Sequence, residues 1–301
     1  MATSFGRVEE AVLTIPPRRR KSPLQRFWFY LQHKPLGTFG FAIMAIIIIV
    51  GIFATWLAPH PFAFAYYDDA QVAPSLEYPM GTDRFGRDIF SRIIHGARIS
   101  LQVGFLATML GTGVGAVLGL VSGYLMGKFD MILQRFLDML MSFPDLILAL
   151  VIVAVLGQNL IWVIVAIAVT ILPRGVRVVR SSTISLREMD FVTASRAIGA
   201  SNRRIILRHI APNTVAPFLI IMSAMFGTAI LTEAGLSFLG LGVPEPYPSW
   251  GRMLAGDAAV YAETAPWMVI FPGLAITITV LGFAFAGDAL RDILDPRLRG
   301  R

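Results

Sequence analysis

The sequence contains no cysteine and only four histidines. Without cysteine the chain can form neither a disulfide framework nor a thiolate metal site. The histidines, His33, His60, His95 and His209, lie too far apart along the chain for the spacing of a metal-binding motif. Paired carboxylates and a Ser-His-Asp arrangement are not evident either. We therefore expect no metal site in this chain, and we expect that it is not an enzyme.

A phosphate-binding loop is missing as well. Gly127 and Lys128 come closest to one, but Phe129 follows where the motif has serine or threonine. Ser122 stands where the motif has its first glycine. We therefore expect no cofactor in this chain, and in particular no bound ATP or magnesium.

Charged residues are scarce, at 15% of the chain, whereas hydrophobic residues make up 55%. Soluble domains have about 25% charged and about 45–50% apolar residues. The long apolar runs predict an all-α, polytopic membrane protein with six transmembrane helices, at residues 36–58, 99–126, 139–156, 160–179, 212–231 and 266–287. The expected divisions are an N-terminal tail (1–35), the first span (36–58), an extracytoplasmic segment (59–98), a five-helix core (99–287) with a cytoplasmic loop (180–211), and a C-terminal tail (288–301).

The basic residues are distributed unevenly between the two sides. Of the 26 lysines and arginines, five fall in expected extracytoplasmic parts and the other 21 in expected cytoplasmic parts. The five are Arg84, Arg87, Arg92, Arg98 and Arg252. This asymmetry follows the positive-inside rule, so both termini and the 180–211 loop are expected in the cytoplasm. It also accounts for the net charge of +7 without a nucleic-acid partner.

Small residues recur every fourth position in the second predicted span. They are Ala107, Gly111, Gly115, Gly119 and Gly123. This spacing places them on one stripe of a helix, where a second helix backbone can approach closely. We interpret Gly111, Gly115, Gly119 and Gly123 as helix-packing residues.

The loop between the fourth and fifth spans has the pattern of a folded segment. Phe191, Ala194, Ser195 and Ile198 have helical spacing, and Gly199 then ends the pattern. The segment is also basic, with Arg196, Arg203, Arg204 and Arg208. A compact basic loop with small side chains on one helix face favours docking into a groove of a cytosolic partner.

This loop resembles the cytoplasmic coupling motif of binding-protein-dependent ABC importer permeases. In that motif a Glu-Ala-Ala triplet is followed after three residues by glycine, and after nine more by I-x-L-P. The triplet maps to Thr193, Ala194 and Ser195, the glycine to Gly199 and the proline to Pro212.

The match is incomplete, because Thr193 replaces Glu, Ser195 replaces Ala, and His209 and Ala211 occupy the Ile and Leu positions. The resemblance implies that the residues that couple to the ATPases are Phe191, Thr193, Ala194, Ser195, Arg196, Ala197, Ile198, Gly199 and Arg203.

Three further stretches resemble the dipeptide/oligopeptide subfamily of these permeases. They are GTDRFGRDIFSRIIHGARISL (residues 81–101), EAGLSFLGLG with PYPSWGRML (233–254), and GDALRDILDPR (287–297). In the first stretch, Asp88 and Arg92 have the i, i+4 spacing of a helical ion pair. We expect a structural helix there that lies along the membrane.

The second stretch is rich in glycine and proline, and we expect it to form a re-entrant or outer-face segment near the translocation path. The candidates there are Glu233, Ser237 and Trp250. Glu233 stands at the end of a span, and we expect it to accept hydrogen bonds from nearby backbone N–H groups rather than to bind substrate.

The resemblance implies a type I ABC importer permease that forms half of a transmembrane pathway in a bacterial or archaeal cytoplasmic membrane. It implies as partners a second homologous permease, two cytosolic ATPases that bind ATP and magnesium, an extracytoplasmic substrate-binding protein and membrane lipid. The cargo stays open between peptides, nickel, opines and short sugars.

Two other functions are considered. A secondary transporter or channel would work without ATPase partners, but it predicts intramembrane charges or a repeat of broken helices, and neither is clear in the sequence. A membrane enzyme would need a cluster of catalytic side chains, which the sequence does not show.

Overall fold

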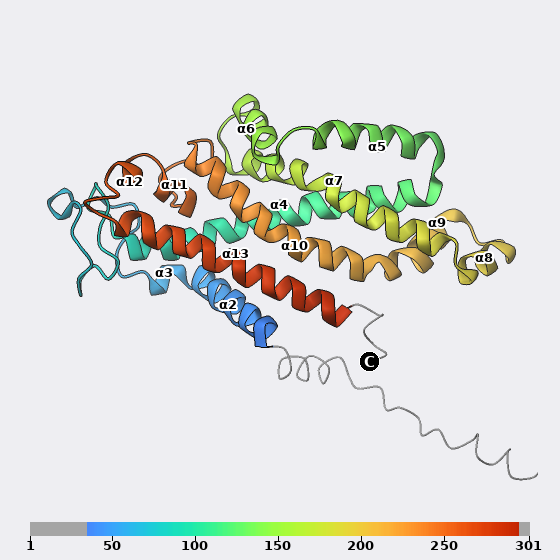
Figure 1. The fold of residues 1–301 in the computed structure, drawn as a ribbon, viewed down its shortest axis with the longest axis horizontal. Helices are drawn as coiled ribbons and strands as arrows, with labels where there is room; N and C mark the ends of the chain where they lie inside the picture. Colours follow the sequence, from blue (N-terminus) through green and yellow to red (C-terminus); the bar gives the residue numbers. More distant parts are fainter. Residues whose placement is uncertain (1–34, 295–301) are drawn as a thin grey trace, which may run out of the picture.

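The computed structural model describes residues 35–294 of the chain. Most of the predicted N-terminal tail and the last seven residues of the predicted C-terminal tail therefore lie outside the described part. The described residues form an elongated bundle of helices. Figure 1 shows α11 and α12 at one end of its long axis and α8 and α9 at the other.

The helices follow one another without a named strand in residues 35–294. Their bounds are α2 (Pro35–Ile52), α3 (Ala54–Leu57), α4 (Ile89–Leu125), α5 (Gly127–Met141), α6 (Asp145–Leu156), α7 (Leu160–Arg187), α8 (Asp190–Ala197), α9 (Asn202–Ile205), α10 (Ala211–Phe238), α11 (Trp250–Leu254), α12 (Asp257–Val260) and α13 (Trp267–Leu294). A 3₁₀ turn spans Tyr67–Asp69, and a π-helical turn, Ile206–Ile210, joins α9 to α10.

The number of membrane spans agrees with the sequence prediction. Within the described residues, five helical stretches are long and apolar enough to cross a membrane: α2, α4, α7, α13 and the stretch from α9 through α10. The pair of α5 and α6 makes a sixth if it is counted as one broken span. The fold is thus all-α with five to six candidate spans.

The third predicted span, residues 139–156, differs from the prediction, because the helix is broken near its start. The chain bends by 92° between α5 and α6. Pro144 follows Phe143 at this break, and a proline disfavours helical geometry in the residue before it. α6 alone has 12 residues, a length of about 18 Å, which is less than the hydrocarbon thickness of about 30 Å. Residues 127–138, expected as a loop, belong to helix α5.

The second predicted span is longer than expected. α4 begins at Ile89 and continues without interruption to Leu125, a total of 37 residues. The residues from 89 to 98 are therefore the first turns of α4. The separate helix that the sequence suggested along the membrane is absent from this stretch.

The core of the bundle is the contact between α4 and α7. A Cβ atom added to any of the four stripe glycines of α4 would lie 2.5 to 2.9 Å from a carbonyl oxygen of α7. These oxygens belong to Ala168, Leu172, Val176 and Arg180, opposite Gly111, Gly115, Gly119 and Gly123 in that order. The two backbones therefore approach as closely as hydrogen side chains permit. Apolar residues beside the stripe, including Val103, Val163, Ile167 and Ile171, are fully buried.

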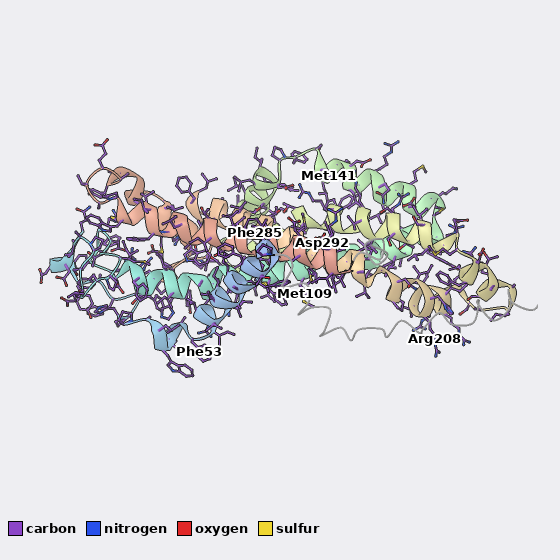
Figure 2. The ribbon with its side chains drawn as sticks, turned by 60° about the horizontal axis from the view of Figure 1, so that its bottom comes forward. Phe53, Met109, Met141, Arg208, Phe285 and Asp292 are labelled. Carbon is purple, nitrogen blue, oxygen red and sulfur yellow. The ribbon has the colours of Figure 1, made fainter. Side chains whose placement is uncertain are left out.

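The first span, α2, lies against α13 on the flank of the bundle (Figure 1). Gly40 of α2 permits this contact, because a Cβ atom there would lie 2.6 Å from the backbone nitrogen of Ala286. Apolar side chains cover the outer surfaces of the helices. Figure 2 shows Phe53 pointing away from the bundle, and Met109 and Met141 are exposed as well. Such a surface fits a lipid environment.

Candidate functional site

Two regions carry the residues that the sequence singled out, one at each end of the bundle. At the α11–α12 end, the segment before α4 folds around the Asp83 carboxylate. Asp83 Oδ1 accepts hydrogen bonds from the backbone N–H groups of Phe85 (2.9 Å) and Arg87 (3.0 Å). Its Oδ2 lies 2.6 Å from Arg87 Nε. Asp83 thus turns the chain sharply in front of α4.

Asp88 and Arg92 do not form the ion pair that their spacing suggested. Asp88 is instead the N-cap of α4, and it accepts hydrogen bonds from the backbone N–H of Phe90 and from both the N–H and the hydroxyl of Ser91. A capping aspartate satisfies N–H groups that the helix start leaves free, and this role wins over the side-chain pair. Arg92 Nε instead lies 3.9 Å from Asp83 Oδ2, and its Nη1 donates to the carbonyl of Phe62 (2.9 Å).

Tyr78 fastens the same segment from the other side. Its hydroxyl donates to Asp69 Oδ2 at 2.8 Å, and its ring is buried. The hydrogen bond to Asp69, together with burial, raises the pKa of Tyr78 to about 12. The neutral, hydrogen-bonded tyrosine is therefore part of this folded segment.

Glu233 lies near the end of α10 and is completely buried. Its Oε1 accepts a hydrogen bond from Ser237 Oγ (2.7 Å), and its Oε2 accepts one from Ser100 Oγ (3.2 Å). The donors are serine hydroxyls from α4 and α10, and not the backbone N–H groups that we expected. Glu233 thus joins α10 to α4.

Trp250 starts α11 and is buried between α4 and α10. Its indole Nε1 donates to the carbonyl of Ile93 at 3.0 Å. Gly96 makes room for the ring, because a Cβ atom there would lie 2.9 Å from the indole. Glu233, Ser237 and Trp250, which the sequence placed near the translocation path, are thus all buried within this chain in the described conformation.

At the opposite end, α8 projects beyond α7 and carries the predicted coupling residues (Figure 1). Its inner face packs on the body of the bundle through Val192 and Ser195, which are both buried. The Ser195 hydroxyl donates to the carbonyl of Phe191 at 2.7 Å. Ser195 therefore faces the bundle and does not share an exposed surface with Ala194.

The outer face of this segment carries small and apolar side chains that are open to solvent. The exposed residues are Phe191, Thr193, Ala194, Arg196, Ala197, Ile198, Gly199 and Arg203. Ile198 is 85% exposed, although it is apolar. Gly199 has a φ of +81°, which lets the chain turn into the loop before α9. The basic Arg208 extends from the same end in Figure 2.

Tyr124, at the end of α4, holds this segment in place, and the sequence analysis did not identify it. Its hydroxyl donates to Asn202 Oδ1 at 2.8 Å, and its carbonyl accepts from Arg187 Nη1 at 3.0 Å. The guanidinium of Arg196 lies 5.5 Å from the centre of the ring. An aromatic residue three positions before the expected loop was the available signal. Tyr124 links α4, α7, α8 and α9.

Three ion pairs connect the broken pair α5 and α6 to α7. They join Asp130 to Arg180 at 2.5 Å, Asp138 to Arg177 at 2.6 Å and Asp145 to Arg174 at 2.8 Å. The arginines are three residues apart and lie on one side of α7. α5 therefore turns its acidic side toward α7, while its apolar residues, including Phe129, Ile132 and Phe136, are exposed.

Within residues 35–294, no group of three or more histidine, cysteine, aspartate or glutamate side chains is placed to hold a metal ion. The described residues form a helical bundle with a protruding surface at the α8–α9 end.

Sequence comparison identifies the chain's relatives. Residues 115–300 match the family described as "Binding-protein-dependent transport system inner membrane component". Residues 22–75 match the "N-terminal TM domain of oligopeptide transport permease C". The dipeptide transport system permease protein DppC of Alkalihalophilus pseudofirmus is 44% identical over 92% of this chain and 91% of its own length. The glutathione transport system permease protein GsiD of Shigella boydii is 42% identical over 97% of each chain.

Structural comparison gives the same fold. An inward-facing structure of the MetNI methionine ABC transporter aligns with a TM-score of 0.56 at 20% identity. The alignment covers 68% of this chain and 96% of that chain. At this identity the likeness concerns the fold, which is that of a type I ABC importer permease. The chain therefore belongs to the inner-membrane component family of binding-protein-dependent transport systems, and it is a multi-pass permease subunit of an ABC importer rather than a secondary transporter or channel.

Proposed function

We propose that this permease forms one half of a transmembrane pathway for dipeptides, oligopeptides or similar small solutes. The support comes from two relatives that are named for a dipeptide and for glutathione, which is itself a small peptide. Both align along almost their whole length. The cargo class is therefore narrower than the sequence alone suggested, with short peptides favoured over nickel, opines or sugars.

The family to which the chain belongs supports the following assembly. A second, homologous permease supplies the other half of the pathway, and an extracytoplasmic binding protein delivers cargo. Two cytosolic ATPases bind and hydrolyse ATP with magnesium, while this chain contributes no cofactor site. In this arrangement the α8–α9 end and both termini face the cytoplasm, and the α11–α12 end faces outward.

The single observation that carries the coupling role is the exposed face of α8. Ile198 and Phe191 leave apolar surface open to solvent at this end, and an exposed apolar surface of this kind is suited to being covered by a partner. The neighbouring Ala194 and Ala197 are small, so a groove on the ATPase can close over them. Tyr124 at the end of α4 contacts Arg196 of α8, Asn202 of α9 and Arg187 of α7, so a displacement of this segment by the ATPase can be passed to a membrane span.

Reconstitution of the complex in liposomes tests this function. We expect ATP-dependent uptake of labelled dipeptides and glutathione only when both permeases, the ATPases and the binding protein are present. A labelled short sugar serves as the control cargo, and we expect no uptake of it. Uptake of peptide by this chain alone, without ATP, would contradict the proposal.

A further inference from the structure

A partly open cavity of about 240 Å³ lies at the α11–α12 end. Its charged lining residues are Asp83, Arg84, Arg87, Arg92, Glu245 and Arg252. Arg87 pairs with Asp83, and the carboxylate nearest to Arg252 is that of Glu245. Apolar side chains, including Met253 and Met268, form the remaining walls. Neither the coupling role nor the packing of the spans uses this cavity.

One of the two carboxylates is fully engaged within the fold. Asp83 accepts two backbone N–H groups and pairs with Arg87 at 2.6 Å. Its acceptor positions are thus occupied by the turn that it stabilises. It balances Arg87 and has little left for a second guanidinium, which agrees with the longer distance of 3.9 Å to Arg92.

The other carboxylate is held only loosely. Glu245 lies 3.9 Å from Arg252 Nη1, and its side chain is 65% exposed, whereas the side chain of Arg252 is only 20% exposed. Arg92 is more deeply buried still, at 4% exposure, and is fixed by its hydrogen bond to Phe62. The cavity therefore contains one buried guanidinium group, Arg92, and one partly buried guanidinium group, Arg252, and each lies 3.9 Å from its nearest carboxylate oxygen.

We propose that this cavity binds a carboxylate group through Arg252 and Arg92. Guanidinium groups bind carboxylates with two parallel hydrogen bonds, and such charge-assisted bonds are strengthened where walls exclude water. At 3.9 Å from the nearest carboxylate oxygen, neither Arg92 nor Arg252 makes a close hydrogen-bonded pair with a carboxylate of the described residues, and an incoming carboxylate can supply one. Glu245, at the rim, competes with the ligand for Arg252.

Two sources can supply this group in a complex of the proposed function, on which the inference rests. One is the terminal carboxylate of a peptide cargo, and the other is an acidic side chain on the binding protein. Both would approach from the outward-facing end. The chemistry at Arg252 is the same in the two cases, and the experiment separates them.

The test uses the complete complex in lipid nanodiscs, with the wild-type chain, Arg252→Gln, Arg252→Lys and Glu245→Gln. The affinity of the binding protein for the complex is measured with and without cargo, and uptake is compared for a dipeptide and for its C-terminal amide. We expect Arg252→Gln to lower either the affinity of the binding protein or the uptake of the dipeptide by a factor on the order of ten, because one charge-assisted pair is lost. Arg252→Lys should retain part of the affected affinity or uptake. Glu245→Gln should have the opposite effect, because it removes the competitor.

If the binding protein is the source, its affinity falls in Arg252→Gln whether or not cargo is present. If the cargo is the source, docking is unchanged, and the loss of uptake is confined to the dipeptide with a free carboxylate. Either outcome supports the cavity as a carboxylate site. Unchanged docking and uptake in Arg252→Gln, or effects of equal sign in Arg252→Gln and Glu245→Gln, would overturn it. Absence of cargo-stimulated ATP hydrolysis in the wild-type complex would instead overturn the proposed function.

Discussion

Individual polar side chains hold the α11–α12 end together, and Tyr78 is the one whose state can be followed by titration. The neutral hydroxyl donates to Asp69, so the folded protein favours the protonated form. Its folded pKa, about 12, lies above the ordinary value of 10. The stabilisation is therefore fully present below about pH 10 and is lost as the pH rises through about 12.

We expect Tyr78 to ionise later than exposed tyrosines in an alkaline titration. The measurement is the ultraviolet absorbance of tyrosinate in the purified chain, compared with that of Tyr78→Phe. The chain has seven tyrosines, and the variant should lack a component that titrates near pH 12 in the wild type. Superimposable late portions of the two curves would contradict the assignment.

For individual residues, sequence spacing could predict some contacts and not others. The position of Glu233 at the end of a span indicated a buried structural acceptor, and the residue is indeed buried with hydrogen-bonding partners. The expected donors were backbone N–H groups, whereas the donors are the hydroxyls of Ser237 and of Ser100, which is 133 residues away along the chain. Asp88 and Arg92 had the spacing of a pair, but a helix start offered Asp88 better donors. Local patterns do not decide between such competing partners.

At the scale of elements, the contact of α4 with α7 depends on hydrogen as the side chain at every fourth position. Gly115→Leu should displace the helices, because a Cβ atom at this position would already lie 2.9 Å from the carbonyl oxygen of Leu172. Overpacking of this kind costs about 1–3 kcal/mol or more. We expect a lower unfolding temperature and a reduced yield of assembled complex.

Val117→Leu is the matched control, because Val117 lies on the same helix but is 60% exposed. Its yield and unfolding temperature should stay close to those of the wild type. Equal losses in Gly115→Leu and Val117→Leu would show that the glycine stripe has no special role in packing.

The coupling role of α8 gives a second prediction at this scale. Ala194→Arg or Gly199→Asp places a charge on the face that we propose docks into an ATPase. Desolvation of an unpaired charge costs several kcal/mol, which exceeds a typical coupling free energy of about 1–3 kcal/mol. Both variants should insert into the membrane normally but lose cargo-stimulated ATP hydrolysis and uptake.

Ala194→Ser is the control for size and position, and it should keep most of the stimulation. The measurement is the ATPase rate of the reconstituted complex with and without cargo-loaded binding protein. Wild-type stimulation in Ala194→Arg and Gly199→Asp would remove α8 from the coupling role.

The elements were predictable where the apolar run was long, and less so where charge and apolar residues alternate. α5 was not predicted, because residues 127–138 lie between two long apolar runs and were expected to form a loop; they carry Lys128, Asp130, Arg135 and Asp138. Two of these residues, Asp130 and Asp138, form ion pairs with arginines of α7, and the sequence of α5 alone does not reveal such partners. α8 was predicted as a helix, but the side of it that is covered was not. Val192 and Ser195 face the bundle, and Val192 packs with Tyr124 and Ile205. These two contact residues lie far from α8 or beyond it in the sequence, so the helical spacing of α8 alone does not show which side they cover.

At the scale of the whole molecule, the two ends differ in the side of the membrane that we assign to them. Single cysteines can be introduced without interference, because the chain has none of its own. Leu76→Cys lies in a fully exposed position at the α11–α12 end, and Ser185→Cys lies in an exposed position near the end of α7. An impermeant thiol reagent applied to intact cells should label Leu76→Cys and leave Ser185→Cys unlabelled.

Permeabilised cells provide the control, since both variants should then react. The asymmetry of basic residues is the physical basis of this orientation. Labelling of Ser185→Cys in intact cells would reverse the assignment and, with it, the side from which cargo enters.

The unbroken length of α4 has a mechanical consequence. Its 37 residues make a rod of roughly 55 Å, longer than the hydrocarbon layer is thick. Near one end, the Ile93 carbonyl of α4 accepts a hydrogen bond from Trp250, and at the other end Tyr124 of α4 donates a hydrogen bond to Asn202 in α9. A rod of this kind can pivot but cannot shorten. A tilt of about 10° around its middle would swing each tip by roughly 5 Å in opposite directions. One tilt of α4 would then move the permease inward at one side of the membrane and outward at the other at the same time.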